Sequence, residues 1–206
     1  MLSFGSQFFI YTCNYANKKT LIDRIQQKYA LQKTRKHKTW DENVHTSIVY
    51  DKYTTLENYI LKSEIPQDLV VVLNQILQNF IEKQNLQSLG EFRISEIWYN
   101  AYSRGQYQNM HKHSNGNNNI FSGIYYIKFD PQQHSNTRFY NPSFEIDFSK
   151  VKNNSYFVFQ PTVKENDIIF FPSDIGHDVP EQICDELRIT ISFNIQCIYY
   201  EHMQYT

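Results

Sequence analysis

The chain of 206 residues contains only three cysteines, and no two of them form a CxxC pair. The odd number and wide spacing of Cys13, Cys184 and Cys197 argue against a disulfide framework and favour free thiols in a reducing compartment. No uninterrupted apolar run approaches the roughly 20 residues that a membrane helix needs. The N-terminal residues also lack the charged start and apolar segment of a signal peptide. We therefore expect a soluble, cytoplasmic protein with no membrane partner.

The sequence also lacks an excess of charge of either sign. Its 20 basic and 21 acidic residues leave a formal net charge of −1, which argues against broad, non-specific binding of nucleic acid. One short basic run, residues 33–38, is the exception, and we interpret it as a solvated helix end or loop. The composition therefore carries no strong nucleic-acid signal, and it leaves the substrate and the oligomeric state unknown.

Apolar side chains, by contrast, are plentiful. Hydrophobic residues make up 41% of the chain and aromatic residues 16%, which is enough to bury a full core. The length suits one domain of jelly-roll size with some additional helices. Because the sequence shows no linker and no internal repeat, we expect residues 1–206 to form a single domain.

The first 90 residues carry the helical patterns. Apolar residues at helical spacing predict helices over residues 17–30 and 66–84, and the proline that begins the second suits a first helical turn. Short apolar runs predict strands over residues 8–11 and 43–50. We expect this part of the chain to supply helical support and edge strands for a sheet.

From residue 91 onward, runs of aromatic and β-branched residues alternate with turn signals. These runs predict strands over residues 91–102, 123–129, 155–159, 167–171 and 187–199. Short strands at this density are typical of a sandwich or jelly roll. The predicted fold class is therefore α+β, mainly β. It has a jelly-roll core over residues 91–200 and N-terminal helices packed on the sheet.

Three histidines occur in a pattern that suits a metal site. His111 and His113 are one residue apart on a segment expected to be extended, so their side chains point to the same face. His177 follows an apolar strand at its turn and can bring a third imidazole from a distant part of the sheet. Neutral imidazole suits iron, zinc, copper and nickel, so the ligands alone do not choose the metal. The remaining four histidines lack such a context and are not predicted to be ligands: His37, His45, His134 and His202.

The last predicted strand contains a polar row. Alternation places Arg188, Thr190 and Ser192 on one face and apolar side chains on the other, so the polar face looks either at water or at a polar barrel interior. Beside a metal, Arg188 and Thr190 could hold the carboxylate of a small acid. The hydroxyls of Tyr102 and Tyr126 could assist them, with ordinary core packing as the alternative for both tyrosines.

Six short motifs, taken in order, carry a resemblance to a known family: Tyr102-x-x-Gly105, His111-x-His113, Ser122-Gly123-Ile124-Tyr125-Tyr126, Phe170-Phe171-Pro172, His177 and Arg188-x-Thr190. Together they resemble the iron(II)/2-oxoglutarate-dependent oxygenases. They look most like a poorly characterised bacterial and phage group with an HxH pair followed by an SG-x-YY strand. The resemblance covers about residues 91 to 197.

This resemblance implies a double-stranded β-helix with a defined site. His111, His113 and His177 would hold Fe(II), and Arg188, with Tyr102 and Thr190, would hold the far carboxylate of the co-substrate 2-oxoglutarate. The implied activity is a dioxygenase reaction that hydroxylates a bound substrate and releases succinate and CO₂. The superfamily includes protein hydroxylases, nucleic-acid demethylases and small-molecule enzymes, so the resemblance does not name the target.

One position departs from the common pattern of this superfamily. The usual ligands are two histidines and one carboxylate, whereas the second position here is His113. Either three histidines bind the metal, or Asp174 or Asp178, which flank His177, replaces one of them. Three neutral ligands leave the full charge of the iron to be neutralised by the dianionic co-substrate. The departure is therefore electrostatically compatible with 2-oxoglutarate.

Two other interpretations stay open on the sequence. A cupin-type three-histidine metalloenzyme, not using 2-oxoglutarate, also carries HxH on a β-barrel. Cupins usually add a glutamate a few residues later, however, and none follows His113 before Glu145. The second interpretation is a non-catalytic jelly-roll binding module of phage type, with incidental histidines. A protein stabilised by both metal and 2-oxoglutarate would favour the oxygenase. Stabilisation by metal alone would favour the cupin, and stabilisation by neither ligand would favour the binding module.

Overall fold

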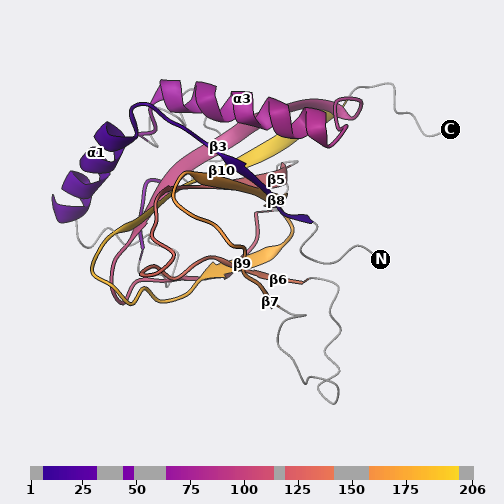
Figure 1. Ribbon diagram of the computed structural model, residues 1–206. Coiled ribbons are helices and arrows are strands. Elements are labelled where there is room, and N and C mark those ends of the chain that lie inside the picture. Colours follow the sequence, from indigo (N-terminus) through magenta and orange to yellow (C-terminus); the bar gives the residue numbers. More distant parts are fainter. Residues whose placement is uncertain (1–6, 32–43, 49–63, 114–118, 142–157, 200–206) are drawn as a thin grey trace, which may run out of the picture.

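The computed structural model describes residues 7–31, 44–48, 64–113, 119–141 and 158–199 (Figure 1). Within these residues ten strands form two antiparallel sheets. The six-stranded sheet runs in the order β1 (Phe9–Thr12), β8 (Asp167–Pro172), β5 (Asn119–Lys128), β10 (Arg188–Tyr199), β3 (Gly90–Tyr102) and β2 (His45–Thr46). The four-stranded sheet runs in the order β4 (Gln108–His111), β9 (Gly176–Val179), β6 (Arg138–Tyr140) and β7 (Val158–Phe159).

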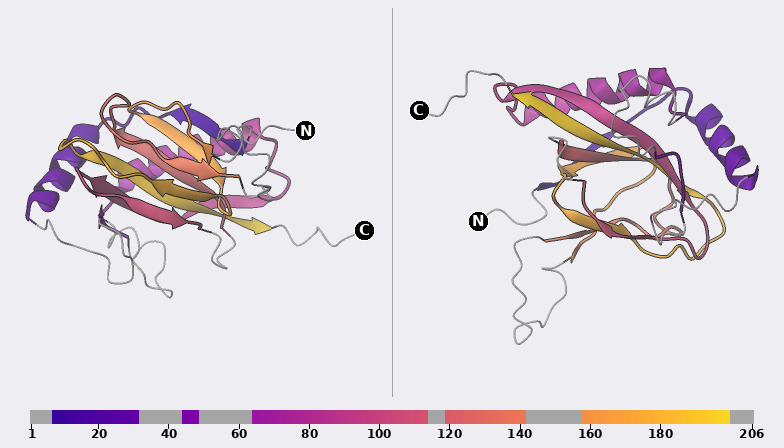
Figure 2. Two further views of the ribbon diagram at one scale, coloured as in Figure 1. Left: turned by 90° about the horizontal axis from the view of Figure 1, so that it is seen from below. Right: turned by 180° about the vertical axis from the view of Figure 1, so that it is seen from behind.

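Two helices, α1 (Lys18–Leu31) and α3 (Gln67–Lys83), lie along one face of the six-stranded sheet, and the four-stranded sheet lies on its other side (Figures 1 and 2). The apolar stripe of α3 is buried against the sheet, where the Phe80 ring stacks on Phe170 at 4.7 Å between centroids. No helix among the described residues has the length and apolar character needed to cross a bilayer. The predicted packing of the N-terminal helices on the sheet is confirmed.

Alternation along the strands of the large sheet divides its side chains between two layers. On β10, Ile189, Ile191 and Phe193 belong to the core under the helices. On β5 and β8, side chains such as Tyr126 and Phe171 point the other way and form a second apolar cluster between the two sheets. That cluster fills only the β5–β8 half of the interior. The β3–β10 half is lined mainly by polar side chains.

The elements predicted from apolar runs are observed with small changes of boundary. The helices predicted over residues 17–30 and 66–84 are α1 and α3, and the five strands from residue 91 onward correspond to β3, β5, β7, β8 and β10. Residues 155–157 of the third predicted strand lie outside the described residues. The strand expected over residues 43–50 is much shorter where it is described, because only His45 and Thr46 pair with β3.

Three strands of the four-stranded sheet were not among the predicted strands, although the segment with His111 and His113 was expected to be extended. They are β4, β6 and β9, which are only three or four residues long and carry polar side chains. Their extended form is set by pairing with one another, as in the antiparallel ladders of β9 with β4 and with β6. The local sequence therefore has little apolar periodicity to reveal them. With them the two sheets complete the mainly β jelly roll that the sequence predicts.

Candidate metal and co-substrate site

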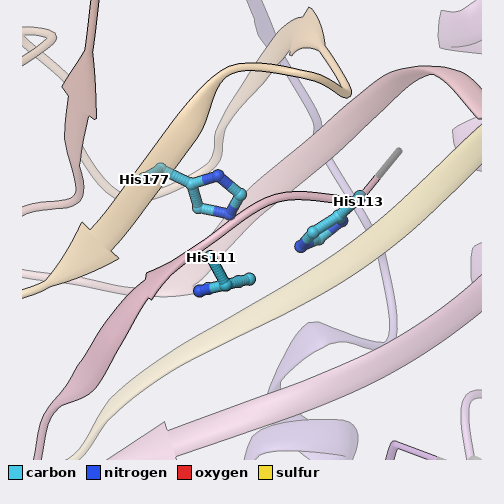
Figure 3. A group of neighbouring side chains, drawn as sticks. All are labelled: His111, His113 and His177. Carbon is cyan, nitrogen blue, oxygen red and sulfur yellow. The ribbon is translucent and has the colours of Figure 1, made fainter. Parts of the chain in front are cut away.

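The three predicted histidines converge between the two sheets (Figure 3). His111 ends β4 and lies opposite His177 on β9, and their ring centroids are 4.3 Å apart. His113, just beyond β4, completes the group, at 4.9 Å from the His177 ring and 5.1 Å from that of His111. One nitrogen from each ring lies within 4.8 Å of the other two. The antiparallel pairing of β4 with β9 is what brings the HxH pair to a histidine 64 residues later in the chain, counted from His113 to His177.

Each of the three imidazoles is oriented through its Nδ1 atom. The Nδ1 of His111 lies 2.8 Å from the carbonyl oxygen of Asn109, and that of His177 lies 3.1 Å from the carbonyl oxygen of Ile175. The Nδ1 of His113 lies 2.6 Å from the side-chain oxygen of Asn194. These partners are all oxygen acceptors, so each Nδ1 donates a proton and each Nε2 keeps the lone pair that a metal needs.

The electrostatic surroundings keep these histidines neutral. Burial, reinforced by the neighbouring His111, lowers the pKa of His113 to about 3. Burial likewise lowers the pKa of His111, and it holds the pKa of His177 well below its ordinary value, with a further contribution from the two other histidines. A neutral imidazole is the form that binds a metal ion, because protonation would occupy its lone pair. At neutral pH little proton competition is therefore expected.

The two aspartates considered as alternative ligands lie outside the histidine cluster. Asp178 points to the opposite side of β9 from His177, where its carboxylate accepts hydrogen bonds from Arg138 Nε at 2.9 Å and from the Tyr140 hydroxyl at 2.8 Å. Asp174 is exposed in the turn before β9. Among the described residues, the group able to hold a metal contains the three histidines and neither aspartate.

The histidines open onto a cavity between the sheets, on the side of β3 and β10. The walls combine polar and apolar groups, and the lining residues include Trp98, Asn100, Tyr102, Gln108, Ile124, Thr137, Val179, Arg188, Thr190 and Ser192. The polar row predicted on the last strand therefore faces a polar interior and not bulk water. Arg188 and the three histidines line the same cavity.

Arg188 has the properties expected of an anion-binding group. Its side chain is only 1% exposed and is enclosed by aromatic rings, with its guanidinium carbon 5.1 Å from the Tyr102 ring centroid and 5.5 Å from that of Tyr126. Nη2 donates to the Thr137 hydroxyl at 3.0 Å, but Nε and Nη1 have no hydrogen-bond partner among the described residues. A buried cation with open donors is costly unless a counter-charge satisfies it. A ligand carboxylate in the cavity would supply that charge.

The other predicted co-substrate residues lie around Arg188. Tyr102 lines the cavity and donates its hydroxyl proton to Gln108 Oε1 at 2.8 Å, and Thr190 lines it from β10. Tyr126 lies behind the guanidinium instead. Its hydroxyl contacts Thr137 Oγ1 at 3.1 Å, it is absent from the cavity lining, and burial raises its pKa. Tyr102 and Thr190 can therefore touch a bound acid, while Tyr126 supports the arginine.

Two polar residues that hold Arg188 and His113 in place were not predicted from the sequence. Thr137, which orients Arg188, comes just before β6 in a segment without any recognisable motif. Asn194, which holds His113, continues the alternating row of Arg188, Thr190 and Ser192 on β10. The alternation could have indicated Asn194, whereas Thr137 is revealed only by the tertiary structure. His45 and His134 lie outside the cluster, as predicted, and His37 and His202 lie outside the described residues.

Comparison with known proteins supports the same chemistry. Residues 96–194 match a family model described as "Putative 2OG-Fe(II) oxygenase". No protein of curated function matches the sequence. The oxygenase match spans the strands that carry the three histidines and Arg188.

Several solved structures have a similar fold. A prolyl-4-hydroxylase from Pseudomonas putida has a TM-score of 0.58 and 10% sequence identity, and the alignment covers 93% of each chain. The viral collagen prolyl hydroxylase vCPH from Paramecium Bursaria Chlorella virus-1, in its 2OG complex, has a TM-score of 0.57 and 11% identity, covering 96% of this chain and 100% of that one. HygX from Streptomyces hygroscopicus, with nickel and 2-oxoglutarate bound, has a TM-score of 0.56 and 8% identity, covering 94% and 84%.

At these identities the structural matches establish the fold alone, a double-stranded β-helix. The family match adds the chemistry, and the histidine cluster beside a buried arginine is consistent with it. Residues 96–194 are therefore similar in sequence to the iron(II)- and 2-oxoglutarate-dependent oxygenases, and the chain shares their fold.

Proposed function

We propose that this oxygenase hydroxylates a bound substrate, with release of succinate and CO₂, and that it holds its iron with three histidines. The observation that carries the proposal is the shared cavity, in which a cluster of three neutral imidazoles and a buried arginine with two open donors line one space. A metal ion and a dicarboxylate would each find there the groups that they require.

His111, His113 and His177 would hold the iron through Nε2, because their Nδ1 atoms are already engaged. When bound, the iron supplies the redox chemistry by which O₂ oxidises 2-oxoglutarate and the substrate. The protein fixes the three rings before the metal arrives, through contacts to Asn109, Ile175 and Asn194. Such contacts set the tautomer and the direction of each ligand.

Arg188 would hold the far carboxylate of 2-oxoglutarate with the donors that lack a protein partner. Thr190 lies on the same cavity wall, and its hydroxyl could donate to the same carboxylate. The Tyr102 hydroxyl could do so by exchanging its bond to Gln108 for one to the carboxylate. Thr137 keeps the guanidinium in place, and the surrounding aromatic rings exclude water from it. Low local polarity strengthens a charge-assisted hydrogen bond, so these rings favour binding as well as packing.

The metal assignment is tested by iron analysis of proteins purified and loaded under anaerobic conditions. The parent should bind one Fe(II) per chain, and His111→Ala or His177→Ala should abolish binding, since two remaining ligands hold the ion poorly. His134→Gln is the matched control. His134 is a buried histidine outside the cavity that contacts Asp130 and Glu186, and this variant should keep the parent's iron content. Full iron occupancy in both alanine variants would refute the ligand assignment.

A further inference from the structure

A chain of hydrogen bonds leads from the metal side of the cavity to a carboxylate on β3. Asn194 on β10 is the cross-strand partner of Glu96 on β3. The Asn194 Nδ2 atom donates to Glu96 Oε2 at 2.5 Å, and its Oδ1 atom lies 2.6 Å from His113 Nδ1. The Ser122 hydroxyl donates to the same Oδ1 atom at 3.0 Å. We propose that Glu96 and Asn194 are positioning residues that lock His113 in the tautomer able to bind the metal. This inference rests on the proposed function, in which His113 is a ligand.

The direction of the chain follows from what each group can do. A carboxylate only accepts hydrogen bonds, so Glu96 draws the NH₂ group of Asn194 toward itself. The amide oxygen then faces His113, and because two acceptors do not hydrogen-bond to each other, the 2.6 Å contact requires an Nδ1–H. The proton is therefore absent from Nε2, the atom that would bind the metal. If the Asn194 amide turned around, its NH₂ group would face Nδ1 and favour the Nε2–H tautomer, which has no lone pair for a metal.

Only His113 depends on a second side chain to fix its tautomer; the two other histidines do not. His111 and His177 donate to the backbone carbonyls of Asn109 and Ile175, which accept and cannot turn into donors. His113 instead relies on a side-chain amide, which offers a donor at one end and an acceptor at the other. Glu96 removes that ambiguity. The position where this site lacks the usual carboxylate ligand is thus the one supported by an outer carboxylate.

The electrostatics of the site favour the same arrangement. Three neutral imidazoles give a metal ion no negative charge from its direct ligands. The Glu96–Asn194 relay places a carboxylate one amide group away from His113, and polarisation along the chain makes the imidazole a better electron-pair donor. The Trp98 ring packs beside this imidazole, with 5.6 Å between the ring centroids of Trp98 and His113.

The experiment measures the His113 tautomer in metal-free protein by long-range ¹H–¹⁵N spectra of histidine-labelled samples, with the signal assigned by its loss in His113→Asn. Affinity for Mn(II) is measured separately by calorimetry. The parent should show a single Nδ1–H form. Glu96→Gln should give a mixture of tautomers, because a glutamine amide can donate or accept. Mn(II) should bind about 10- to 100-fold more weakly, the usual effect of losing an outer-shell partner.

The matched control is Glu91→Gln, which removes the same charge from an exposed position on the same strand and should change neither measurement. A second variant exchanges the positions of the carboxylate and the amide in the hydrogen-bond chain. In Glu96→Gln/Asn194→Asp, the introduced aspartate accepts from both the introduced glutamine and His113. The single Nδ1–H form and the parent's Mn(II) affinity should return to within about threefold, well inside the outer-shell effect. A purely structural role for Glu96 would not predict rescue by a second substitution.

Two results would overturn the relay: an Nε2–H form of His113 in the parent, or a Glu96→Gln protein that keeps both the single Nδ1–H form and the parent's affinity. The tautomer is read without metal, so the two proposals fail separately. A parent whose His113 tautomer depends on Glu96, but which binds no Mn(II), would support the relay and refute the three-histidine metal site.

Discussion

His113 is the residue at which this chain departs from the common oxygenase triad. Its ring lies with those of His111 and His177, while the two neighbouring aspartates lie away from the cluster. The spacing of the HxH pair was enough to predict that these histidines share a face. The support of His113 by Asn194 was not predictable, because the two residues are 81 positions apart and meet only when β4 approaches β10.

His113→Asp tests this position at the level of one side chain. The substitution recreates the common ligand set, and a carboxylate has no tautomer to fix. We expect the variant to keep one Fe(II) per chain and its iron affinity to become insensitive to Glu96→Gln. Metal analysis and calorimetry of the single and double variants measure both effects. Loss of iron in His113→Asp, with iron retained in His113→Ala, would show that His113 is not a ligand.

The three cysteines give a second prediction at the residue scale. Cys13 and Cys197 are buried, and burial raises the pKa of the Cys13 thiol to about 11, whereas Cys184 is partly exposed. Because the thiolate is the reactive form, a thiol reagent at about pH 8 should label one cysteine rapidly in the folded protein and all three after denaturation. Cys184→Ser should remove the rapid phase. Rapid labelling of Cys13 in the folded protein would contradict the burial described above.

At the scale of elements, the Phe193 ring of β10 packs directly over Gly123 of β5. A Cβ atom at this position would lie 2.2 Å from the Phe193 ring, so the glycine of the SG-x-YY motif is required by packing. Gly123→Ala should lower the free energy of unfolding by about 1–3 kcal/mol, the usual cost of overpacking a core. Urea denaturation measures this loss, and Phe193→Leu in the same chain should recover part of it.

Gly176→Ala is the control, since its Cβ atom would meet Met110 at an ordinary 3.6 Å. Its free energy of unfolding should stay close to that of the parent. Equal stability of Gly123→Ala and Gly176→Ala would show that the contact with Phe193 is not limiting.

The start of α3 is joined to the segment before α1 by Asp68. Its carboxylate accepts from Asn17 Nδ2 at 2.7 Å, from the Tyr15 hydroxyl at 2.9 Å and from the Leu69 amide at 3.0 Å. The Asn17 bond, followed by those from Tyr15 and the backbone, lowers the pKa of Asp68 below its ordinary 3.8. A carboxyl group whose folded pKa is lowered stabilises the protein above its unfolded pKa, and this stability is lost as the pH falls through the folded pKa.

Asp68→Asn should therefore cost about 0.5–1 kcal/mol of unfolding free energy at neutral pH, where the charge also favours the helix N-terminus. The difference from the parent should shrink as the pH falls below about 4. Denaturation curves at several pH values measure it. Glu82→Gln, at the other end of α3, should cause no loss. A cost for Asp68→Asn that does not change with pH would refute the electrostatic explanation.

The helices and the long strands were predictable because each carries its own apolar period. Three short strands of the second sheet, β4, β6 and β9, were not, because they acquire their extended form by pairing with one another. The same limit applied to the site. The histidines and Arg188 were predicted because they occur in recognisable motifs. Thr137 and Glu96 were not, because their roles depend on contacts made across the interior.

For the whole molecule, the interior is divided between an apolar half under β5 and β8 and a polar half under β3 and β10. This division favours the oxygenase over a cupin that needs no 2-oxoglutarate. In such a cupin, the Nε and Nη1 donors of Arg188 would remain buried without a counter-charge. A non-catalytic module would have the same difficulty and would also leave the histidine cluster without a role.

Calorimetric titration of 2-oxoglutarate into the Mn(II)-loaded protein is the direct test of the site formed by the three histidines and Arg188. The parent should bind one molecule per chain. Arg188→Ala should weaken binding by about 10- to 1000-fold, since a hydrogen bond to a charged group contributes about 1.5–3 kcal/mol and a buried one costs more when its partner is lost. Arg188→Lys should be intermediate, because lysine keeps the charge but loses the planar fork. All variants should still bind the metal.

The control is Arg104→Ala, which removes a surface arginine paired with Asp185 and should bind 2-oxoglutarate like the parent. The expected result is one 2-oxoglutarate per metal-loaded chain, with affinity dependent on Arg188 and independent of Arg104. A parent that binds no 2-oxoglutarate, or an Arg188→Ala protein that binds it as tightly as the parent, would contradict it.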